Sequence, residues 1–463
     1  MRPHPAILCL AACAGSPGDD REGRILQALS EDNLVWARRD PALVAGKLRK
    51  MQRDPYAWLR GTASLYWRDV TDAGGERAPT TFGSPAASRV LLVADPHPEN
   101  LGTFRATDGQ QVIDWNDFDA TGYGPFTLDV RRLATGLVIA SAGDDAGLAA
   151  DLARAVAAGY AAAIAQLAAG ARLGPVTAGD HPLLDDEFAR ALRKGEAREA
   201  LEEVAPVLGG VRALAFGDLE PVGADGVIED RLEAVDAETS VWLDRAVAQW
   251  RAQVPAGASL GEITLRSRRI GAGVASYAAY RYDVVLAGPT PALEDDRLIE
   301  LKETREGLIL RGVPRLAAAE WPTPAVRSID SQRRLHARPD ADALLGAAQV
   351  GGLSLKIRDR EAYQRGLDHE DLAALATSDR PSLLALATLL GGVLARAHGQ
   401  TVTEEQLPGH QVIAPLLAGR AEAFGDELVR DALADAAQLR ADFASMQGRD
   451  LAPLVIPPAL ELP

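Results

Sequence analysis

The segment that most restricts how this chain can fold is residues 91–129, where acidic and amide side chains gather around short apolar runs. After the apolar run 90–93, the loop ADPHPENLG carries Asp95, His97 and Asn100. A second apolar run leads into VIDWNDFD, which carries Asp114, Asp117 and Asp119. The two runs are typical of short strands, with a turn at residues 107–109 between them. The fold must therefore hold these polar side chains close to two neighbouring strands.

The order of these residues is that of a phosphoryl-transfer site. An Asp followed five positions later by an Asn, then by a strand and another Asp, is the spacing of a kinase-type catalytic loop and its metal-binding Asp. Asp95 fits the base that accepts the acceptor's proton, and Asn100 and Asp114 fit the metal ligands. Such oxygens suit Mg²⁺. The alternative is that Asp, Pro, Asn and Gly here only make turns, which does not account for the spacing.

The neighbouring polar residues allow more than one interpretation. Asp117 and Asp119 either add metal ligands or cap the turn at residues 122–125. His97 is interpreted as loop support through hydrogen bonding. Arg60 either directs its guanidinium at a phosphate or carboxylate, or simply precedes the glycine that ends a helix.

A second polar constellation comes much later in the chain. The segment RSRRIGAGVASYAAYRYDVVLAG, followed by DRLIELKETRE, predicts antiparallel strands around a glycine-rich turn. Gly271 and Gly273 would let the backbone approach phosphates closely, and Lys302 would supply positive charge. Taken singly, these are a hairpin turn and an exposed strand lysine. Together they match the kinase arrangement, in which the lysine lies on a strand after the glycine-rich loop.

Composition argues against a nucleic-acid partner. The chain has 49 basic and 65 acidic residues and a formal charge of −16, which repels a phosphate backbone. The densest basic cluster, Arg266, Arg268 and Arg269, is too short to reverse that sign. The sequence also lacks a Walker-type phosphate loop and the zinc-protease and serine-hydrolase motifs.

The start of the chain suggests a lipid anchor. MRPHPAILCLAACAGS combines a basic residue, a short apolar run and LAAC, which resembles a bacterial lipoprotein signal with Cys13 as the lipidated residue. We therefore expect a lipid-anchored protein of the cell envelope, attached to the membrane through Cys13. The alternatives are a chance apolar start and a cytoplasmic protein. The only cysteines are Cys9 and Cys13, so we expect no disulfide in the folded body.

Apolar periodicity predicts an α+β protein with a largely helical lobe and a smaller β-rich lobe. Helical spacing covers residues 24–67, with a break at Asp54-Pro55, and returns after residue 129 and again after residue 381. The expected organisation is a leader at 1–23, helices and the catalytic-loop lobe at 24–258, a β-rich phosphate lobe at 259–325, and a mostly helical part at 326–463.

These motifs together resemble a bacterial family, the domain of unknown function 2252 family, whose members are similar to protein kinases and aminoglycoside phosphotransferases. The resemblance runs through PYAWLRG, ADPHPENLG, VIDWNDFD, GPFTLDVRRLA, RRIGAGVASYAAYRYDVVL, LIELKE and LARAHG. It implies that Asp129 is a structural acid beneath the catalytic loop. One departure is Ala94, where the family usually has Gly and where the added methyl group restricts the backbone.

The order of the motifs is unusual for a kinase, because Gly271, Gly273 and Lys302 follow the catalytic loop instead of preceding it. The resemblance therefore implies a circularly permuted, two-lobed protein-kinase-like fold. The leading hypothesis is a phosphotransferase that uses ATP and Mg²⁺ on an unidentified acceptor. The alternatives are a non-catalytic envelope lipoprotein that retains this fold and a metal-dependent phosphohydrolase.

Overall fold

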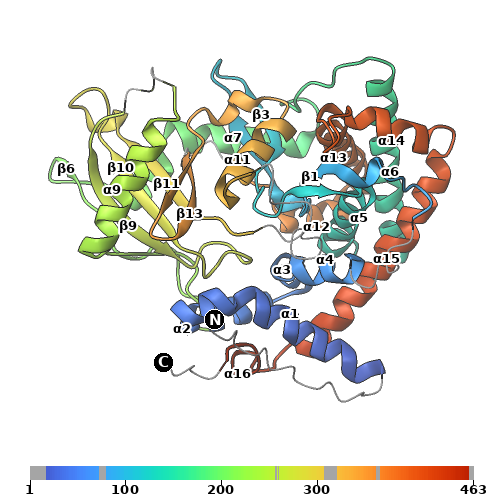
Figure 1. The fold of residues 1–463 in the computed structure, drawn as a ribbon, viewed down its shortest axis with the longest axis horizontal. Helices are drawn as coiled ribbons and strands as arrows, with labels where there is room; N and C mark the ends of the chain where they lie inside the picture. The colour runs from blue at the N-terminus through green and yellow to red at the C-terminus, as the bar shows by residue number, and fades with distance from the viewer. Residues whose placement is uncertain are drawn as a thin grey trace, which may run out of the picture.

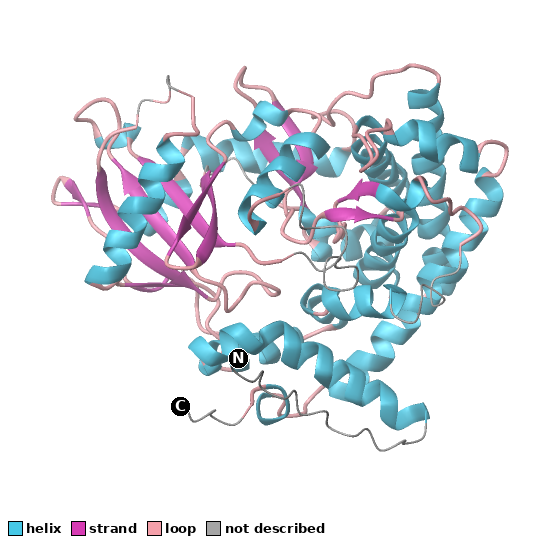
Figure 2. Ribbon diagram, viewed as in Figure 1, coloured by secondary structure: helices cyan, strands magenta, loops and turns pink. Residues whose placement is uncertain are grey.

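The computed structural model describes residues 17–71, 80–255, 258, 260–306, 321–360 and 365–457. Cys13, the predicted lipidation site, lies outside these residues. The described chain forms a largely helical part and a β-rich part that lie side by side (Figure 1). Figure 2 shows the strands of the large sheet gathered in one part and most helices in the other, with a helix also lying against the sheet and short strands among the helices. The predicted α+β class is confirmed.

The first described helices lie beneath both parts of the molecule (Figure 1). They are α1 (Pro17–Arg39), α2 (Pro41–Met51), α3 (Pro55–Gly61) and α4 (Ala63–Thr71). The break expected at Asp54-Pro55 is the start of α3, where the Asp54 carboxylate accepts hydrogen bonds from the N–H groups of Tyr56 and Ala57. A carboxylate cap followed by Pro is a strong helix start, because Pro fills a position whose N–H has no partner in the helix.

The helical part has its own apolar core. Its helices and those on the sheet are α5 (Phe126–Leu137), α6 (Ala146–Ala168), α7 (Pro182–Glu196), α8 (Glu199–Val204), α9 (Ala237–Arg251), α11 (Pro324–Leu335), α12 (His369–Ser378), α13 (Arg380–Gln400), α14 (Gly409–Leu417), α15 (Ala421–Met446) and α16 (Ala452–Val455). Short 3₁₀ turns are η2 (Ala87–Arg89), η3 (Pro98–Asn100), η5 (Leu293–Asp295) and η7 (Pro339–Asp342), and η4 (Val138–Ala142) is a π-helical turn.

The β-rich part is built on one antiparallel sheet, in which seven strands of the described chain pair in the order β12-β13-β11-β10-β9-β8-β7. Their bounds are β7 (Gly217–Asp218), β8 (Arg231–Glu233), β9 (Ile263–Ile270), β10 (Arg281–Leu286), β11 (Arg297–Glu303), β12 (Gly346–Val350) and β13 (Leu353–Asp359). The sheet is wider than the β-rich range 259–325, because strands from both sides of that range in the sequence also join it.

Within the described part of the chain, three two-stranded sheets lie outside the large one. They are β1 (Val90–Leu92) with β4 (Gly122–Gly124), β2 (Leu101–Arg105) with β3 (Gln111–Trp115), and β5 (Val207–Leu208) with β6 (Val211–Arg212). The strands expected at 90–93 and 111–115 are therefore present as β1 and β3. They do not pair with each other, since β3 forms a hairpin with β2, the continuation of the catalytic loop.

Among the residues that the structure describes, two helices of the helical part are long and apolar enough to cross a membrane by length and composition alone. These are α6 and α13, and most of each helix is buried. They pack closely together: a side-chain carbon at Gly159 of α6 would collide with the backbone at Thr388 of α13, and one at Gly391 with the backbone at Val156. Their apolar character therefore serves the core of the folded chain.

This contact predicts a large effect for a small substitution. Gly159→Ala should lower the free energy of unfolding by about 1–3 kcal/mol, because the added methyl group forces the two helices apart. Gly23 in α1 is a matched control, since a side-chain carbon there would have nothing within 4 Å, so Gly23→Ala should be neutral or stabilise by about 0.5–1 kcal/mol. Urea unfolding followed by circular dichroism measures both. Equal effects of the two substitutions would contradict this packing.

Candidate active site

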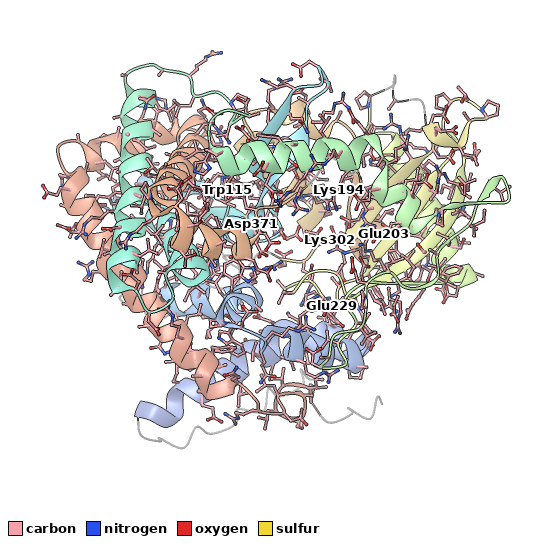
Figure 3. All side chains as sticks on the ribbon, turned by 180° about the vertical axis from the view of Figure 1, so that it is seen from behind. Trp115, Lys194, Glu203, Glu229, Lys302 and Asp371 are labelled. Carbon is pink, nitrogen blue, oxygen red and sulfur yellow. The ribbon has the colours of Figure 1, made fainter. Side chains whose placement is uncertain are left out.

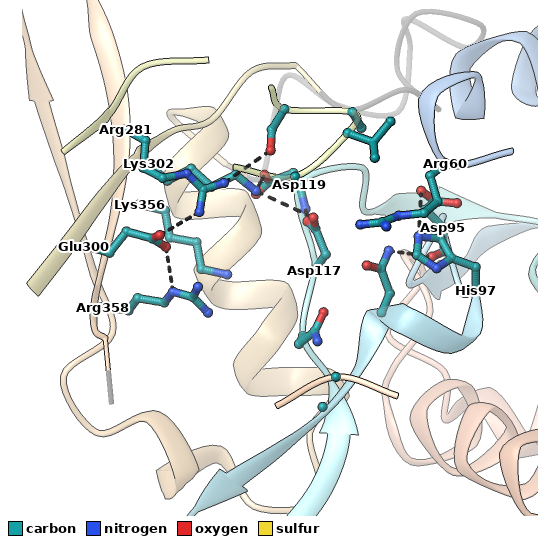
Figure 4. Close-up of a pocket in the computed structure, with 18 of the residues that line it drawn as sticks. Arg60, Asp95, His97, Asp117, Asp119, Arg281, Glu300, Lys302, Lys356 and Arg358 are labelled. Carbon is teal, nitrogen blue, oxygen red and sulfur yellow. Dashed lines mark hydrogen bonds and ion pairs between the residues drawn. The ribbon is translucent and has the colours of Figure 1, made fainter. Parts of the chain in front are cut away.

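A polar cleft lies between the sheet and the helical part, with a volume of about 280 Å³. Figure 4 shows sheet side chains on one wall, Asp95, His97 and Arg60 on the other, and Asp117 and Asp119 between them. Seen from behind in Figure 3, Lys302 lies at this boundary between the two parts. The cleft thus brings together the polar residues of segment 91–129 and those of the later segment that carries Gly273 and Lys302.

The sheet wall follows from strand alternation. On β10, β11 and β13 the apolar side chains turn toward α9 and form a shared core with Trp250. Because neighbouring side chains on a strand point to opposite faces, the charged residues between them lie on the other face, where Arg281, Glu300, Lys302, Lys356 and Arg358 line the cleft. The strand register then places Arg281, Lys302 and Lys356 directly side by side. We call these three residues the cation row.

Three like charges side by side need anions nearby, because like charges placed directly opposite on paired strands are destabilising. Glu300 supplies one: its carboxylate binds Arg281 at 2.7 Å and Arg358 at 2.9 Å. Burial alone would raise the pKa of Glu300, but the two guanidinium groups hold it well below its usual value. Glu300 is therefore ionised and occupied by arginines.

The anions for Lys302 come from across the cleft. Its Nζ lies 2.6 Å from Asp119 and 3.6 Å from Asp117. Burial opposes the charged form of Lys302, yet the two carboxylates raise its pKa above the usual value. Burial would likewise raise the pKa of Asp117, but Lys302 lowers it. Lys302 and Asp117 are therefore charged at neutral pH.

Lys356 is buried differently. Its Nζ donates a hydrogen bond to the Gln332 side chain of α11 at 2.8 Å, and no carboxylate of the described residues is shown within ion-pair distance of it. Burial lowers the pKa of Lys356 from its usual value, and Asp119 opposes this shift. A buried ammonium that faces a cleft and is held by an amide is suited to receive an anionic ligand.

The opposite wall is the predicted catalytic loop. Asp95 accepts a hydrogen bond from Arg132 Nε at 2.9 Å, and His97 Nε2 lies 3.9 Å from it. Burial raises the pKa of Asp95, and the Arg132 guanidinium opposes that shift. Burial keeps the pKa of His97 well below its usual value, so its ring is neutral. The Asn100 amide donates to the Asp95 carbonyl oxygen at 3.0 Å, which leaves its own oxygen as an acceptor in the cleft.

A buried carboxylate holds this loop in place. Asp129 of α5 accepts hydrogen bonds from the N–H groups of Val93 and Ala94 and contacts His398 Nε2 at 3.1 Å. His398 in turn contacts the Tyr160 hydroxyl at 2.8 Å through its other ring nitrogen. Ala94 has a φ of 72°, the left-handed region that favours glycine. Alanine thus keeps the backbone shape expected for glycine here, at the cost of local strain.

Asp114 does not join the cleft. It lies within β3, 1% exposed, and forms a buried ion pair with Arg396 of α13. Its second oxygen accepts a hydrogen bond from the N–H of Ala337 at 2.9 Å. Asp117 and Asp119, which lie just beyond the end of the strand, do line the cleft.

The glycine-rich segment connects β9 and β10 and reaches the cleft with one of its two predicted glycines. Gly273, with a φ of 80°, lines the cleft together with Ser276. Gly271 instead packs against the backbone at Ile228 and Glu229, and its carbonyl accepts a hydrogen bond from Lys50. Gly271 therefore shapes the base of the loop and does not face the cleft.

Arg60 lines the cleft near Asp95, but its guanidinium pairs with Glu99 at 2.5 Å. The same carboxylate contacts His369 Nδ1 at 2.6 Å, and Glu99, Asp368 and His369 lie close enough to share a cation. Since Glu99 is already neutralised by Arg60, we interpret this group as an ion-pair cluster behind the loop.

Arg281 and Lys356 were not predicted as site residues, although a signal was present in the sequence. In LSLKIRD, apolar residues alternate with polar ones, so Lys356 and Arg358 must share a face. In RYDVVL, the same alternation places the side chains of Arg281 and Tyr282 on opposite faces of the strand. Only the strand register, which the sequence does not reveal, shows that these side chains are neighbours of Lys302.

The contrast between Asp114 and Asp117 gives a matched test. Asp114→Ala should lower the free energy of unfolding by about 3–5 kcal/mol, because it leaves Arg396 charged and buried without its partner. Asp117→Ala removes a side chain that is 39% exposed and should change that free energy by no more than about 1 kcal/mol. Chemical denaturation of the two variants measures both. A larger loss in Asp117→Ala would contradict these assignments.

Comparison with known proteins gives a family. No curated protein and no solved structure matches the chain. One family model does match, over residues 39–448, and it is described as an uncharacterized protein conserved in bacteria. This range contains both walls of the cleft and the helices that support them. The chain belongs to the domain of unknown function 2252 family.

Proposed function

We propose that this chain is a Mg²⁺-dependent phosphotransferase that uses ATP. One observation carries the proposal: a cation row on the sheet faces Asp117, Asp119 and the Asp95 loop across a single cleft. Cations on one wall and carboxylates on the other match what phosphoryl transfer needs, because its catalysis is mostly positioning and charge stabilisation. A structural role alone would not require buried lysines around an open cavity.

The side chains at the centre of the cleft fit a magnesium ion. Asp117, Asp119 and the Asn100 amide oxygen are the hard oxygen donors that Mg²⁺ prefers, and Mg²⁺ usually takes only one or two carboxylates together with phosphate oxygens. When bound, the ion would neutralise charge on the transferred phosphate. Lys302 now supplies the positive charge beside these carboxylates. Asp114 has no place in this group, because Arg396 already occupies it.

In the proposed reaction, Asp95 acts as the base. The acceptor's hydroxyl oxygen forms a bond to the γ-phosphorus while its proton passes to the Asp95 carboxylate. The bond from the γ-phosphorus to the β–γ bridging oxygen breaks, and ADP leaves with that electron pair. Arg132 holds Asp95 in position, and the cation row binds the phosphate oxygens. Gly273 lets the loop backbone approach them closely.

We further propose that the fold is a circularly permuted kinase. The glycine-rich segment, the strand lysine and α11 follow one another along the chain, which is the kinase order for these parts. The catalytic loop, however, precedes them in the sequence. Permutation requires chain ends that lie close together. In support of this, α1 and α16, the first and last described helices, pack in the same apolar core.

Nucleotide binding tests this function. Isothermal calorimetry of the full chain should show binding of Mg-ATP, and Lys302→Ala should weaken it by roughly 10- to 100-fold, the loss of one charge-assisted hydrogen bond. Lys194→Ala is the matched control, since Lys194 lies on the surface and pairs with Glu199 at 3.1 Å. The affinity of Lys194→Ala for Mg-ATP should equal that of the parent. Failure of the parent to bind Mg-ATP would remove the proposed function.

The cellular location remains a prediction from the sequence. A lipid anchor on Cys13 would place the protein in the envelope, away from cytoplasmic ATP. Mass spectrometry of the protein purified from its native cells tests this. A diacylated Cys13 at the mature N-terminus is the predicted result, and an unmodified Met1 would contradict it.

A further inference from the structure

A second cavity adjoins the cleft and shares part of its lining. Its volume is about 140 Å³, and it shares Asp95, Asp117, Asp119 and Lys302 with the cleft. Its remaining walls come mainly from the helices that precede the catalytic loop, with Trp36 of α1, Lys47 of α2 and Ala63 of α4 among them. We call this cavity the inner chamber. The shared carboxylates therefore stand between two chambers.

The lining of the inner chamber differs from that of the cleft. Small side chains, Ala63, Ala120, Ala275 and Ala279, give it apolar walls, and Trp36 adds an indole ring. Lys47, which lines only this chamber, already has a partner, because its Nζ donates a hydrogen bond to the Asn33 side chain at 2.9 Å. Glu303 is occupied as well, by Arg39 at 2.9 Å. The charged groups that line only this chamber, which also include Asp32, Arg305 and Glu306, are thus held by partners within the protein.

These features restrict the ligand. Three carboxylates and two cations, Lys302 and Arg60, share the junction, so neither an anionic nor a cationic acceptor meets charges of one sign there. The Trp36 ring already has Lys47 and Arg305 at 4.9 and 4.7 Å from its centre, which leaves it poorly suited to a further cation. A neutral molecule with an apolar face remains. Its hydroxyl would point toward Asp95, whose carboxylate lines both cavities.

We propose that the inner chamber binds the acceptor, and that this acceptor is a small neutral alcohol with an apolar face. The inference rests on the proposed phosphotransferase function. The nucleotide occupies the cleft, and the alcohol packs against Trp36 with its hydroxyl oxygen beside Asp95. That oxygen bonds to the γ-phosphorus as ADP leaves, and its proton moves to Asp95. The helices before the catalytic loop thereby determine acceptor specificity.

The test uses the full chain saturated with Mg²⁺ and a non-hydrolysable ATP analogue, with benzyl alcohol as the probe. Its ring matches the apolar walls and its hydroxyl matches the junction. Saturation-transfer NMR should detect benzyl alcohol bound to the parent. Ala63→Phe, which fills the chamber, and Trp36→Ala, which removes its aromatic wall, should each weaken this binding at least tenfold. Calorimetry should show the affinity for the Mg-nucleotide unchanged within twofold in both variants.

Ala292→Phe, on an exposed turn away from both chambers, is the matched control and should bind the probe as the parent does. Retained affinity for the Mg-nucleotide shows that a variant is folded. Two different chamber variants are used so that the test still stands if one of them fails to fold. If the loaded parent does not bind benzyl alcohol, or if both chamber variants bind it fully, the acceptor site is overturned while the nucleotide function stands. If the parent does not bind the Mg-nucleotide, the proposed function fails, and the acceptor inference fails with it.

Discussion

The structure depends on how three cations are tolerated side by side on one sheet face. Strand register makes Arg281, Lys302 and Lys356 direct neighbours, and α9 covers the other face, so these side chains have no alternative direction. Glu300 neutralises the sheet from within, and Asp117 and Asp119 neutralise it from the helical part. The ion pairs across the cleft therefore couple the two parts of the molecule, while Lys356 is held by the amide of Gln332.

Two neighbouring carboxylates show how position within a strand decides a residue's role. Asp114 lies inside β3, where its partners are Arg396 and the backbone of Ala337, and it fastens the hairpin to α13. Asp117 lies beyond the end of the strand, where an Asx turn bonds its oxygen to the Asp119 N–H at 3.0 Å. The turn directs both of these later carboxylates into the cleft. Asp114 within the strand therefore stabilises the fold, while Asp117 and Asp119 just beyond it line the cleft.

Much of this site was predictable from local sequence. The Asp95 to Asn100 spacing, the Gly273 turn and the strand that carries Lys302 are local patterns, and the structure brings all four residues to one cleft. The burial of Asp114 was not foreseen, because its partner, Arg396, lies 282 residues away and no local pattern reveals a buried ion pair. Lys356 and the inner chamber were missed for the same physical reason. They depend on strand register and on how α1 and α2 pack, which are set by the whole fold.

The most direct measurement is a crystal structure of the full chain with Mg²⁺ and a non-hydrolysable ATP analogue. The account predicts the triphosphate in the cleft, hydrogen-bonded to the ammonium groups of Lys302 and Lys356, with the terminal phosphate beside Asp95 and the ion among Asn100, Asp117 and Asp119. A nucleotide bound elsewhere, with the ion pair between Lys302 and Asp119 unchanged, would contradict it.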